Sequence, residues 1–270
     1  MGQNTSRWGR EARVYVSERN GVRSLHLGNN FVQSAMRLAF PNHLELAYTR
    51  CMMGFLLFHP HPENIIMVGL GGGSLAKFVH YRLTRAKTTV VEINEEVISA
   101  ARNYFCFPED DERLHTVIGD GADYIATHPG EADVLMVDGF DGGCQVPSLC
   151  TQDFYNNARG ALRKNGVLVV NLLGREKGFQ NYMRRMESSF SGNVTTLTAE
   201  PVGNVVAFAF RQNPAKRLWN DLPSRAVDLE QRFALPFTEF AKKLNPPAIT
   251  NSQLSRPEMV NNRSVSGREP

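Results

Sequence analysis

The chain has 270 residues, of which 42% are hydrophobic and 21% are charged, and its formal net charge is +3. These proportions are ordinary for a globular protein, and the length suffices for one large domain with a small appendage. Lysine and arginine are spread along the chain without the long basic run that marks a nucleic-acid-binding arm, and the most apolar stretch is too short to span a bilayer.

Three features of the chain bear on its compartment and on metal binding. The four cysteines form no CxxC pair, and a disulfide framework is not expected at this length. The first residues are polar and lack the apolar core of a signal peptide. His59 and His61 alternate with prolines, so we expect a linker there and no metal site. We therefore expect a reduced, cytoplasmic protein that binds neither membrane nor nucleic acid.

Residues 1–41 are expected to form a small N-terminal β-hairpin segment. Two short strands, residues 13–18 and 22–27, flank an Asn-Gly turn, which is the strongest short-range hairpin signal. A helix is then expected over residues 43–58, with Asn42 as its N-cap, because apolar side chains recur there at helical spacing.

From residue 64 onward, short apolar strands alternate with helices, which is typical of βαβ units in a parallel sheet. The expected strands cover residues 65–68, 88–92, 115–118, 133–137 and 166–172. Two last strands, residues 194–198 and 205–210, are joined by a loop too short for a parallel crossover, so we expect them to be antiparallel neighbours at one edge.

The predicted fold is therefore α/β, a Rossmann-like doubly wound sheet of the S-adenosylmethionine-dependent methyltransferase type, mostly parallel with an antiparallel edge strand. We assign this domain to residues 42–244, of which 214–244 are expected to be helical with breaks at Pro223 and Pro236. Residues 245–270 lack an apolar period and are expected to form a disordered tail.

The first strand of the alternating region ends in a glycine-rich loop that runs directly into a helix. Gly69, Gly71, Gly72 and Gly73 permit a tight turn and let the backbone approach a ligand closely. The pattern is GxGGGS, with Ser74 in place of the last glycine of the dinucleotide fingerprint. A purely structural turn is the alternative interpretation.

Three further positions at strand ends favour an adenosine-containing ligand. Glu92 ends the second strand, where a carboxylate accepts hydrogen bonds from both ribose hydroxyls, although it could instead cap a helix. Asp120 and Gly121 follow the third strand near the expected adenine edge, and there a helix N-cap is an equally good interpretation of Asp120. Loop and acids together do not distinguish NAD from S-adenosyl compounds.

The fourth strand ends in Asp138, and Asp141 follows in the next loop. In a doubly wound sheet the first and fourth strands flank the crevice in which ligands bind. A carboxylate at this strand end therefore points at the reacting part of the ligand, unless the segment is simply a turn rich in Asp and Gly.

Taken together, these residues resemble the spermidine synthase (polyamine aminopropyltransferase) family over roughly residues 21–173. The family's glycine-rich loop, ribose Glu, Asp-Gly pair and Asp-x-x-Asp motif match the segments described above. Tyr48 stands where the family has a substrate-side tyrosine, and Gln33 belongs to a segment similar to its strand-then-Gln segment. Two departures are that Gly72 replaces an Asp that lies near the donor's amine, and that the N-terminal β-rich domain is short.

The resemblance implies that an aminopropyl group passes from decarboxylated S-adenosylmethionine to a polyamine such as putrescine, with release of methylthioadenosine. Asp138 would be the base or proton acceptor, and Asp141, Tyr48 and Gln33 would bind the amine. The glycines, Glu92 and the Asp-Gly pair would bind the donor, which is a co-substrate rather than a tightly bound cofactor. The family often forms homodimers, partly through the N-terminal region that is short here, so the resemblance leaves the oligomeric state open.

Three alternatives remain open from the sequence. The first is a methyltransferase that uses S-adenosylmethionine itself, which Gly72 favours because the acid suited to the decarboxylated donor is missing. The second is a non-catalytic homologue that binds adenosyl compounds or polyamines. The third, an NAD-dependent oxidoreductase, is disfavoured because Ser74 breaks the fingerprint and no His, Tyr or Lys catalytic set is evident.

Overall fold

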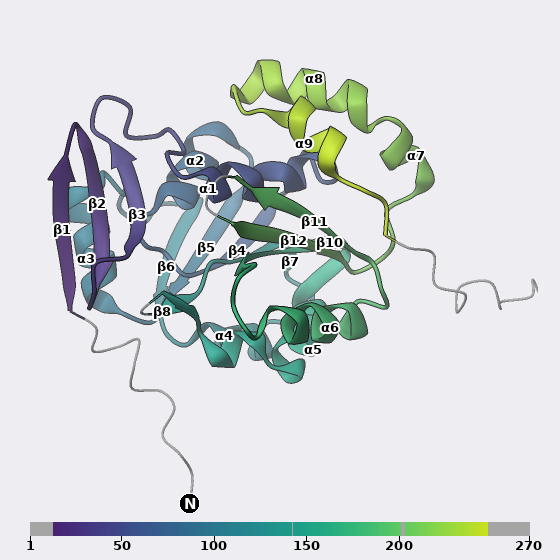
Figure 1. Ribbon diagram of the computed structural model, residues 1–270, viewed down its shortest axis with the longest axis horizontal. Coiled ribbons are helices and arrows are strands. Elements are labelled where there is room, and N and C mark those ends of the chain that lie inside the picture. The colour runs from purple at the N-terminus through teal and green to yellow at the C-terminus, as the bar shows by residue number, and fades with distance from the viewer. Residues whose placement is uncertain (1–12, 142, 201–202, 248–270) are drawn as a thin grey trace, which may run out of the picture.

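The computed structural model describes residues 13–141, 143–200 and 203–247. Within this part of the chain, seven strands form one sheet in the order β11-β12-β10-β7-β4-β5-β6 (Figure 1). The strands are β4 (Asn64–Val68), β5 (Lys87–Glu92), β6 (Leu114–Ile118), β7 (Ala132–Val137), β10 (Leu162–Leu173), β11 (Val194–Ala199) and β12 (Asn204–Phe210). The pairs from β6 to β10 are parallel, whereas β12 is antiparallel to both β10 and β11. The predicted Rossmann-like sheet with an antiparallel edge is confirmed.

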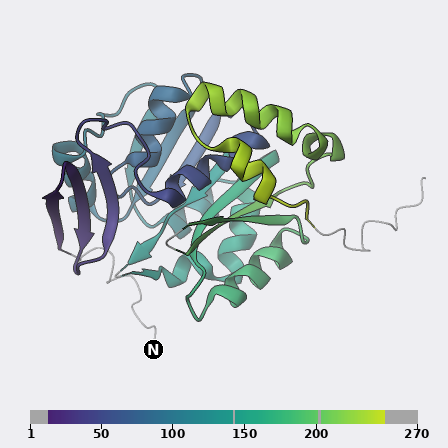
Figure 2. The ribbon, with the colours of Figure 1, turned by 45° about the horizontal axis from the view of Figure 1, so that its top comes forward.

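Helices cover both faces of the sheet, as Figure 2 shows. One face packs against α1 (Ala47–Met52), the 3₁₀ helix η1 (Met53–Leu57), α2 (Ser74–Arg82), α3 (Glu95–Tyr104), α8 (Leu222–Phe233) and α9 (Phe237–Lys243). The other face packs against α4 (Gly121–Thr127), α5 (Gln152–Ala161) and α6 (Phe179–Ser189). Alternate residues of β4, β10 and β12 enter one or the other of these two cores, because successive side chains of a strand point to opposite faces.

The N-terminal segment has one more strand than the predicted hairpin. Within the described residues, β1 (Val14–Arg19), β2 (Val22–Leu27) and β3 (Val32–Arg37) form a three-stranded antiparallel sheet. β3 is short and carries the small residues Ser34 and Ala35, so its pattern is weak, yet its Met36 is buried in the core of the main domain. Tertiary packing therefore completes a strand that local sequence does not specify.

The predicted helix at 43–58 was wrong in its start and its end. The α-helix begins at Ala47 instead of after Asn42, and it gives way to the 3₁₀ helix η1 at Met53. The guanidinium of Arg50 donates to the backbone carbonyls of Leu44 and Glu45, at 2.8 and 2.7 Å. Those carbonyls are thereby satisfied without an additional helical turn.

Smaller differences concern loops and the C-terminal helices. β10 begins at Leu162 rather than 166, with a register shift before Val167. Pro223 does not interrupt a helix but lies in the first turn of α8, where its missing N–H costs nothing. A short helix, α7 (Lys216–Asn220), precedes it.

The structure describes only part of the predicted N-terminal segment and of the predicted C-terminal tail. The hydroxyl of Thr195 donates to the carbonyl of Asn245 at 2.7 Å, and Pro247 is buried, so residues 245–247 pack on the domain. The rest of the predicted tail, residues 248–270, and residues 1–12 of the N-terminal segment lie outside the described residues.

Candidate functional site

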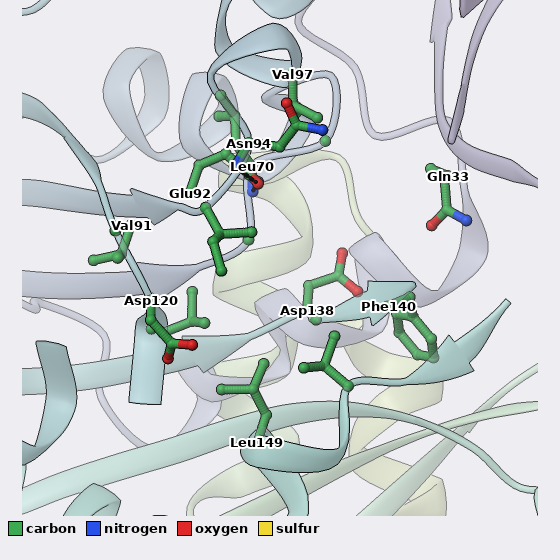
Figure 3. Close-up of a pocket in the computed structure, with 18 of the residues that line it drawn as sticks. Gln33, Leu70, Val91, Glu92, Asn94, Val97, Asp120, Asp138, Phe140 and Leu149 are labelled. Carbon is green, nitrogen blue, oxygen red and sulfur yellow. Dashed lines mark hydrogen bonds between the residues drawn. The ribbon is translucent and has the colours of Figure 1, made fainter. Parts of the chain in front are cut away.

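A pocket lies at the edge of the sheet where the parallel strands β4, β5, β6 and β7 end (Figure 3). The carboxyl ends of parallel strands meet at one edge, so residues far apart in sequence converge there. Of the residues predicted for the site, seven line this pocket: Gln33, Gly69, Gly71, Glu92, Asp120, Gly121 and Asp138. Glu92 and Asp120 lie at one end of the pocket, and Asp138 and Gln33 at the other.

The glycine-rich loop divides into a pocket-facing part and a buried part. Gly69 has a φ of +92°, and a Cβ there would collide with the backbone oxygen of Asp138, so the loop and the end of β7 touch directly. Gly72 and Gly73 are buried and are not among the lining residues of the described chain. A Cβ on Gly72 would lie 2.8 Å from the ring of Phe105 and 2.9 Å from the Ser34 hydroxyl, so a larger residue there requires rearrangement.

Glu92 lines the pocket and also holds the loops around it. Its side chain is 9% exposed. One carboxylate oxygen accepts from the backbone N–H of Leu70 at 2.9 Å, and the other accepts from Asn94 at 3.0 Å. Burial raises the pKa of this carboxyl, and the backbone N–H donors oppose that rise. Glu92 thus both fixes the glycine-rich loop and presents a carboxylate to the pocket.

Asp120 both caps a helix and lines the pocket, two placements that the sequence left as alternatives. Its Oδ1 accepts from the backbone N–H groups of Ala122 at 2.7 Å and Asp123 at 3.3 Å, so it caps α4. It also lines the pocket, as does Gly121, where a Cβ would collide with the side chain of Val68. The close packing of α4 on β4 therefore requires a glycine immediately after the capping residue.

Asp138 follows β7 directly and receives two side-chain hydrogen bonds. The amide of Asn171 donates to its Oδ1 at 2.9 Å, and the hydroxyl of Tyr48 donates to the same carboxylate. Burial raises the pKa of Asp138 above its ordinary value, and the hydrogen bonds from Asn171 and Tyr48 oppose the rise. A carboxyl group with a raised pKa is a better proton acceptor than one in water.

Tyr48 brings three predicted residues together, although it is not among the lining residues that the structure describes. Its hydroxyl lies 3.5 Å from the backbone carbonyl of Gln33 and is bonded to Asp138. Burial and the charge of Asp138 raise the pKa of Tyr48 well above its ordinary value, so the phenol remains a donor at neutral pH.

Asp141 lies in a small β-ribbon that follows the end of β7. It belongs to β8 (Phe140–Asp141), which pairs with β9 (Cys144–Gln145) at Cys144. The short 3₁₀ helix η2 (Pro147–Cys150) comes next, and this stretch contributes Phe140, Ser148 and Leu149 to the pocket wall.

Sequence reasoning missed Asn171, which lies in β10 and is 1% exposed. A single amide inside the apolar run of this strand was the available signal, because a buried polar side chain requires a partner. Asn204, 7% exposed and at the start of β12, was missed for the same reason.

The described residues contain neither a candidate metal site nor a candidate membrane-spanning helix. No group of three or more His, Cys, Asp or Glu side chains there could hold a metal ion. None of the helices placed by the structure is long and apolar enough to cross a bilayer.

Comparison with known proteins identifies relatives of this chain. The model of the spermine/spermidine synthase domain matches residues 45–208. A polyamine aminopropyltransferase of Chromobacterium violaceum is 43% identical over 240 residues, which cover 89% of this chain and 91% of that protein. One from Neisseria meningitidis is 40% identical over 225 residues, covering 83% and 86%.

A solved structure shares the fold. A probable spermidine synthase from Corynebacterium glutamicum superposes with a TM-score of 0.67 at 17% identity, covering 81% of this chain and 85% of that one. The family model spans more than half of the chain, and the relatives align along almost their full length. The chain therefore belongs to the spermine/spermidine synthase family.

Proposed function

We propose that this chain is a polyamine aminopropyltransferase, which moves an aminopropyl group from decarboxylated S-adenosylmethionine to a polyamine such as putrescine. Membership of the family supports the reaction class. The observation that carries the mechanism is Asp138, a carboxylate with a raised pKa at the end of β7, facing a pocket whose other end presents Glu92 and Asp120.

The chemistry requires positioning and one proton transfer. The amine nitrogen attacks the carbon beside the sulfonium, a C–N bond forms, and the C–S bond breaks to release methylthioadenosine. A sulfonium is already a good leaving group, so holding the two reactants in line supplies much of the acceleration. The acceptor amine, with an ordinary pKa of about 10, must first lose a proton. Asp138 is proposed to take it.

The remaining site residues divide between the two substrates. Gly69, Gly71, Glu92 and the Asp120–Gly121 turn are proposed to bind the donor, which is a co-substrate that leaves after each turnover. We propose that Gln33 and Asp141 bind the polyamine. Tyr48 acts by donating to Asp138, since its hydroxyl already bonds that carboxylate.

Gly72 and Gly73 were expected to contact the donor, and their packing supports a different role. Both are buried beneath Phe105 and Phe107, so we propose that they shape the loop from behind. The acid that the family carries at the position of Gly72 has no counterpart in the part of the glycine-rich loop that lines the pocket in the described chain, which is Gly69, Leu70 and Gly71. This observation keeps a methyltransferase using S-adenosylmethionine as the second candidate.

The deciding experiment is product analysis by mass spectrometry. Purified protein is incubated with a panel of polyamines and either decarboxylated or intact S-adenosylmethionine. Methylthioadenosine together with an amine heavier by one aminopropyl group is the expected result, and it identifies the acceptor. S-adenosylhomocysteine as the product would establish a methyltransferase, and binding of either donor without product would establish a non-catalytic homologue.

A homodimer, which the family often forms, is part of the same proposal. Phe31, Val32 and Phe40 are 64%, 49% and 50% exposed around the N-terminal sheet, which supports a contact there. Light scattering on the eluting protein measures the mass. A particle of twice the 30.2 kDa chain mass is expected, and a monomer across the accessible concentration range contradicts it.

A further inference from the structure

Two buried amides connect the antiparallel edge of the sheet to Asp138. Asn204, at the start of β12, donates from its side-chain nitrogen to the side-chain oxygen of Asn171 at 2.9 Å. Asn171, in β10, donates from its own nitrogen to Asp138 Oδ1, also at 2.9 Å. The two amides are 7% and 1% exposed, so water does not compete for these bonds.

The strand register explains why these three residues meet. Val170 is paired with Val137 in the parallel ladder, which brings the next residue of each strand, Asn171 and Asp138, to the same height. On the other side, Asn204 is opposite Leu173 in the antiparallel ladder, so it is a diagonal neighbour of Asn171 on the same face.

The direction of the two hydrogen bonds from Asn204 to Asn171 to Asp138 matters because an amide has one donating and one accepting end. The nitrogen of Asn204 occupies the oxygen of Asn171, which leaves the nitrogen of Asn171 as the end that faces the carboxylate. The reversed amide would face Asp138 with its oxygen, and two acceptors would repel each other. Asn204 therefore reinforces the orientation in which Asn171 donates to Asp138.

We propose that Asn204 is a positioning residue of the active site, which acts through Asn171 by holding that amide as a donor to Asp138. The inference rests on the proposed function, since it assigns Asn204 a role in the step that Asp138 performs. Asn204 is not a lining residue of the pocket in the described chain. It acts only through the two hydrogen bonds from Asn204 to Asn171 and from Asn171 to Asp138, which we call the relay.

The groups that face Asp138 come from several elements of the fold. Tyr48 approaches from α1 and donates to it, while Glu92 from β5 and Asp120 before α4 line the same pocket. Burial raises the pKa of Asp138, and its two hydrogen bonds lower it. Loss of the Asn171 donor therefore raises the pKa of Asp138 further. As the pH falls, Asp138 is then protonated at a higher pH than in the wild type and can no longer accept the amine's proton.

The test compares two substitutions that act on the same amide. Asn204→Ala removes the donor without adding charge, so the side-chain amide of Asn171 can rotate and exchange the positions of its nitrogen and oxygen. Asn204→Asp keeps the shape and, in its ionised form, offers only acceptors, which draw the nitrogen of Asn171 away from Asp138. The acidic limb of the pH profile of kcat/KM should move to higher pH in both variants, and further in Asn204→Asp. A move of one pH unit corresponds to a roughly tenfold loss of activity below the limb.

A second variant separates the relay from simple charge repulsion. In an Asn171→Ala background the relay is already broken, so adding Asn204→Asp should move the limb much less than it does in the wild type. The matched control is Asn193→Asp, the same chemical change at a buried residue (6% exposed) at the opposite end of the β11–β12 pair. It should leave the limb where the wild type has it.

A measurement without substrates keeps this inference distinct from the proposed function. The carbon-13 signal of the Asp138 carboxyl, assigned by its absence in Asp138→Asn, is titrated by NMR in wild type and variants. An upward shift of its midpoint in Asn204→Ala and Asn204→Asp supports the relay, even if no aminopropyl transfer is found. An unmoved midpoint in both, or an equal shift in the Asn171→Ala background, overturns it.

Discussion

The two ends of the pocket are built in different ways. The proposed donor side, defined as Gly69, Gly71, Glu92 and Asp120, comes from the ends of consecutive strands and from the loops that follow them. The proposed acceptor side, defined as Gln33 and Asp138 in the pocket wall together with Tyr48, which contacts both, joins the N-terminal sheet, the first helix and the fourth parallel strand, β7. Asn171 and Asn204 support it from the far strands β10 and β12.

This difference has a physical consequence for each side. Donor-side residues are held mostly by backbone groups of their own loops, as when Glu92 accepts from Leu70 and Asp120 accepts from Ala122. Acceptor-side residues are held by side chains from distant segments, so their geometry depends on the packing of the whole domain. Substitutions on the donor side should therefore change binding, and those on the acceptor side should change turnover and its pH dependence.

The largest expected effect follows from Asp138→Asn. The amide cannot accept the amine's proton, so kcat should fall by about 10²–10⁴-fold, the usual contribution of a general base. The affinity for the donor, measured by calorimetry, should change little because the donor side is untouched. Methylthioadenosine release reports turnover, and wild-type rates in this variant would remove Asp138 from the mechanism.

Asp133→Asn is the matched control for that variant. Asp133 lies near the opposite end of the same strand and accepts from the backbone N–H groups of Glu63 and Asn64, each at 2.9 Å. Both bonds use Oδ2, so the amide oxygen of an asparagine can keep them, and the substitution removes the negative charge and its salt bridge with Arg163 at 3.3 Å. The loss should cost up to about 1 kcal/mol of stability and lower Tm slightly. Its turnover at a temperature where it remains folded should match the wild type.

A smaller effect, confined to binding, is expected from Glu92→Gln. The carboxylate accepts from the N–H groups of Leu70 and Asn94 through different oxygens, whereas the amide turns an NH₂ group toward one of these donors. The glycine-rich loop is then held less well, and the proposed acceptance from a ribose hydroxyl is weakened. The donor Kd should rise by about 10–100-fold, the equivalent of one charged hydrogen bond, with kcat at saturation changed less. An effect on kcat alone would place Glu92 on the acceptor side and break the comparison.

The same contrast explains how much of the molecule could be predicted from its sequence. Glycine-rich turns and acids at strand ends are local signals, so the sheet and the pocket-lining positions Gly69, Gly71, Glu92 and Asp120 could be predicted from the pattern. Asn171 and Asn204 lie 33 residues apart, and neither belongs to a motif. Their partnership follows only from the order of the strands. The start of α1 was misplaced for a similar reason, because Arg50 takes up the carbonyls that a longer helix would have used.

Tyr48→Phe tests whether the acceptor side acts through Asp138. The substitution removes one of the two donors that hold the pKa of this carboxyl down, so the pKa rises further above its ordinary value. Because an acid with a higher pKa is protonated up to a higher pH, the acidic limb of the pH profile of kcat/KM should move to higher pH. Activity below the limb should fall by roughly tenfold for each pH unit that the limb moves. A uniform loss at all pH values would instead indicate that Tyr48 contacts the polyamine directly.

The smallest expected effect, Asp120→Asn, separates the two roles of one donor-side residue. Asn and Asp are equally good N-caps, and the bonds to Ala122 and Asp123 both use Oδ1, so the stability of the fold should change by less than about 0.5 kcal/mol. The capping oxygen then orients the new NH₂ group where Oδ2 stood. If Asp120 accepts from the adenine amine, two donors now face each other, and the donor Kd should rise several-fold at unchanged Tm. Unchanged Kd and Tm together would show that Asp120 serves the helix alone, which would leave Glu92 as the acid of the donor side.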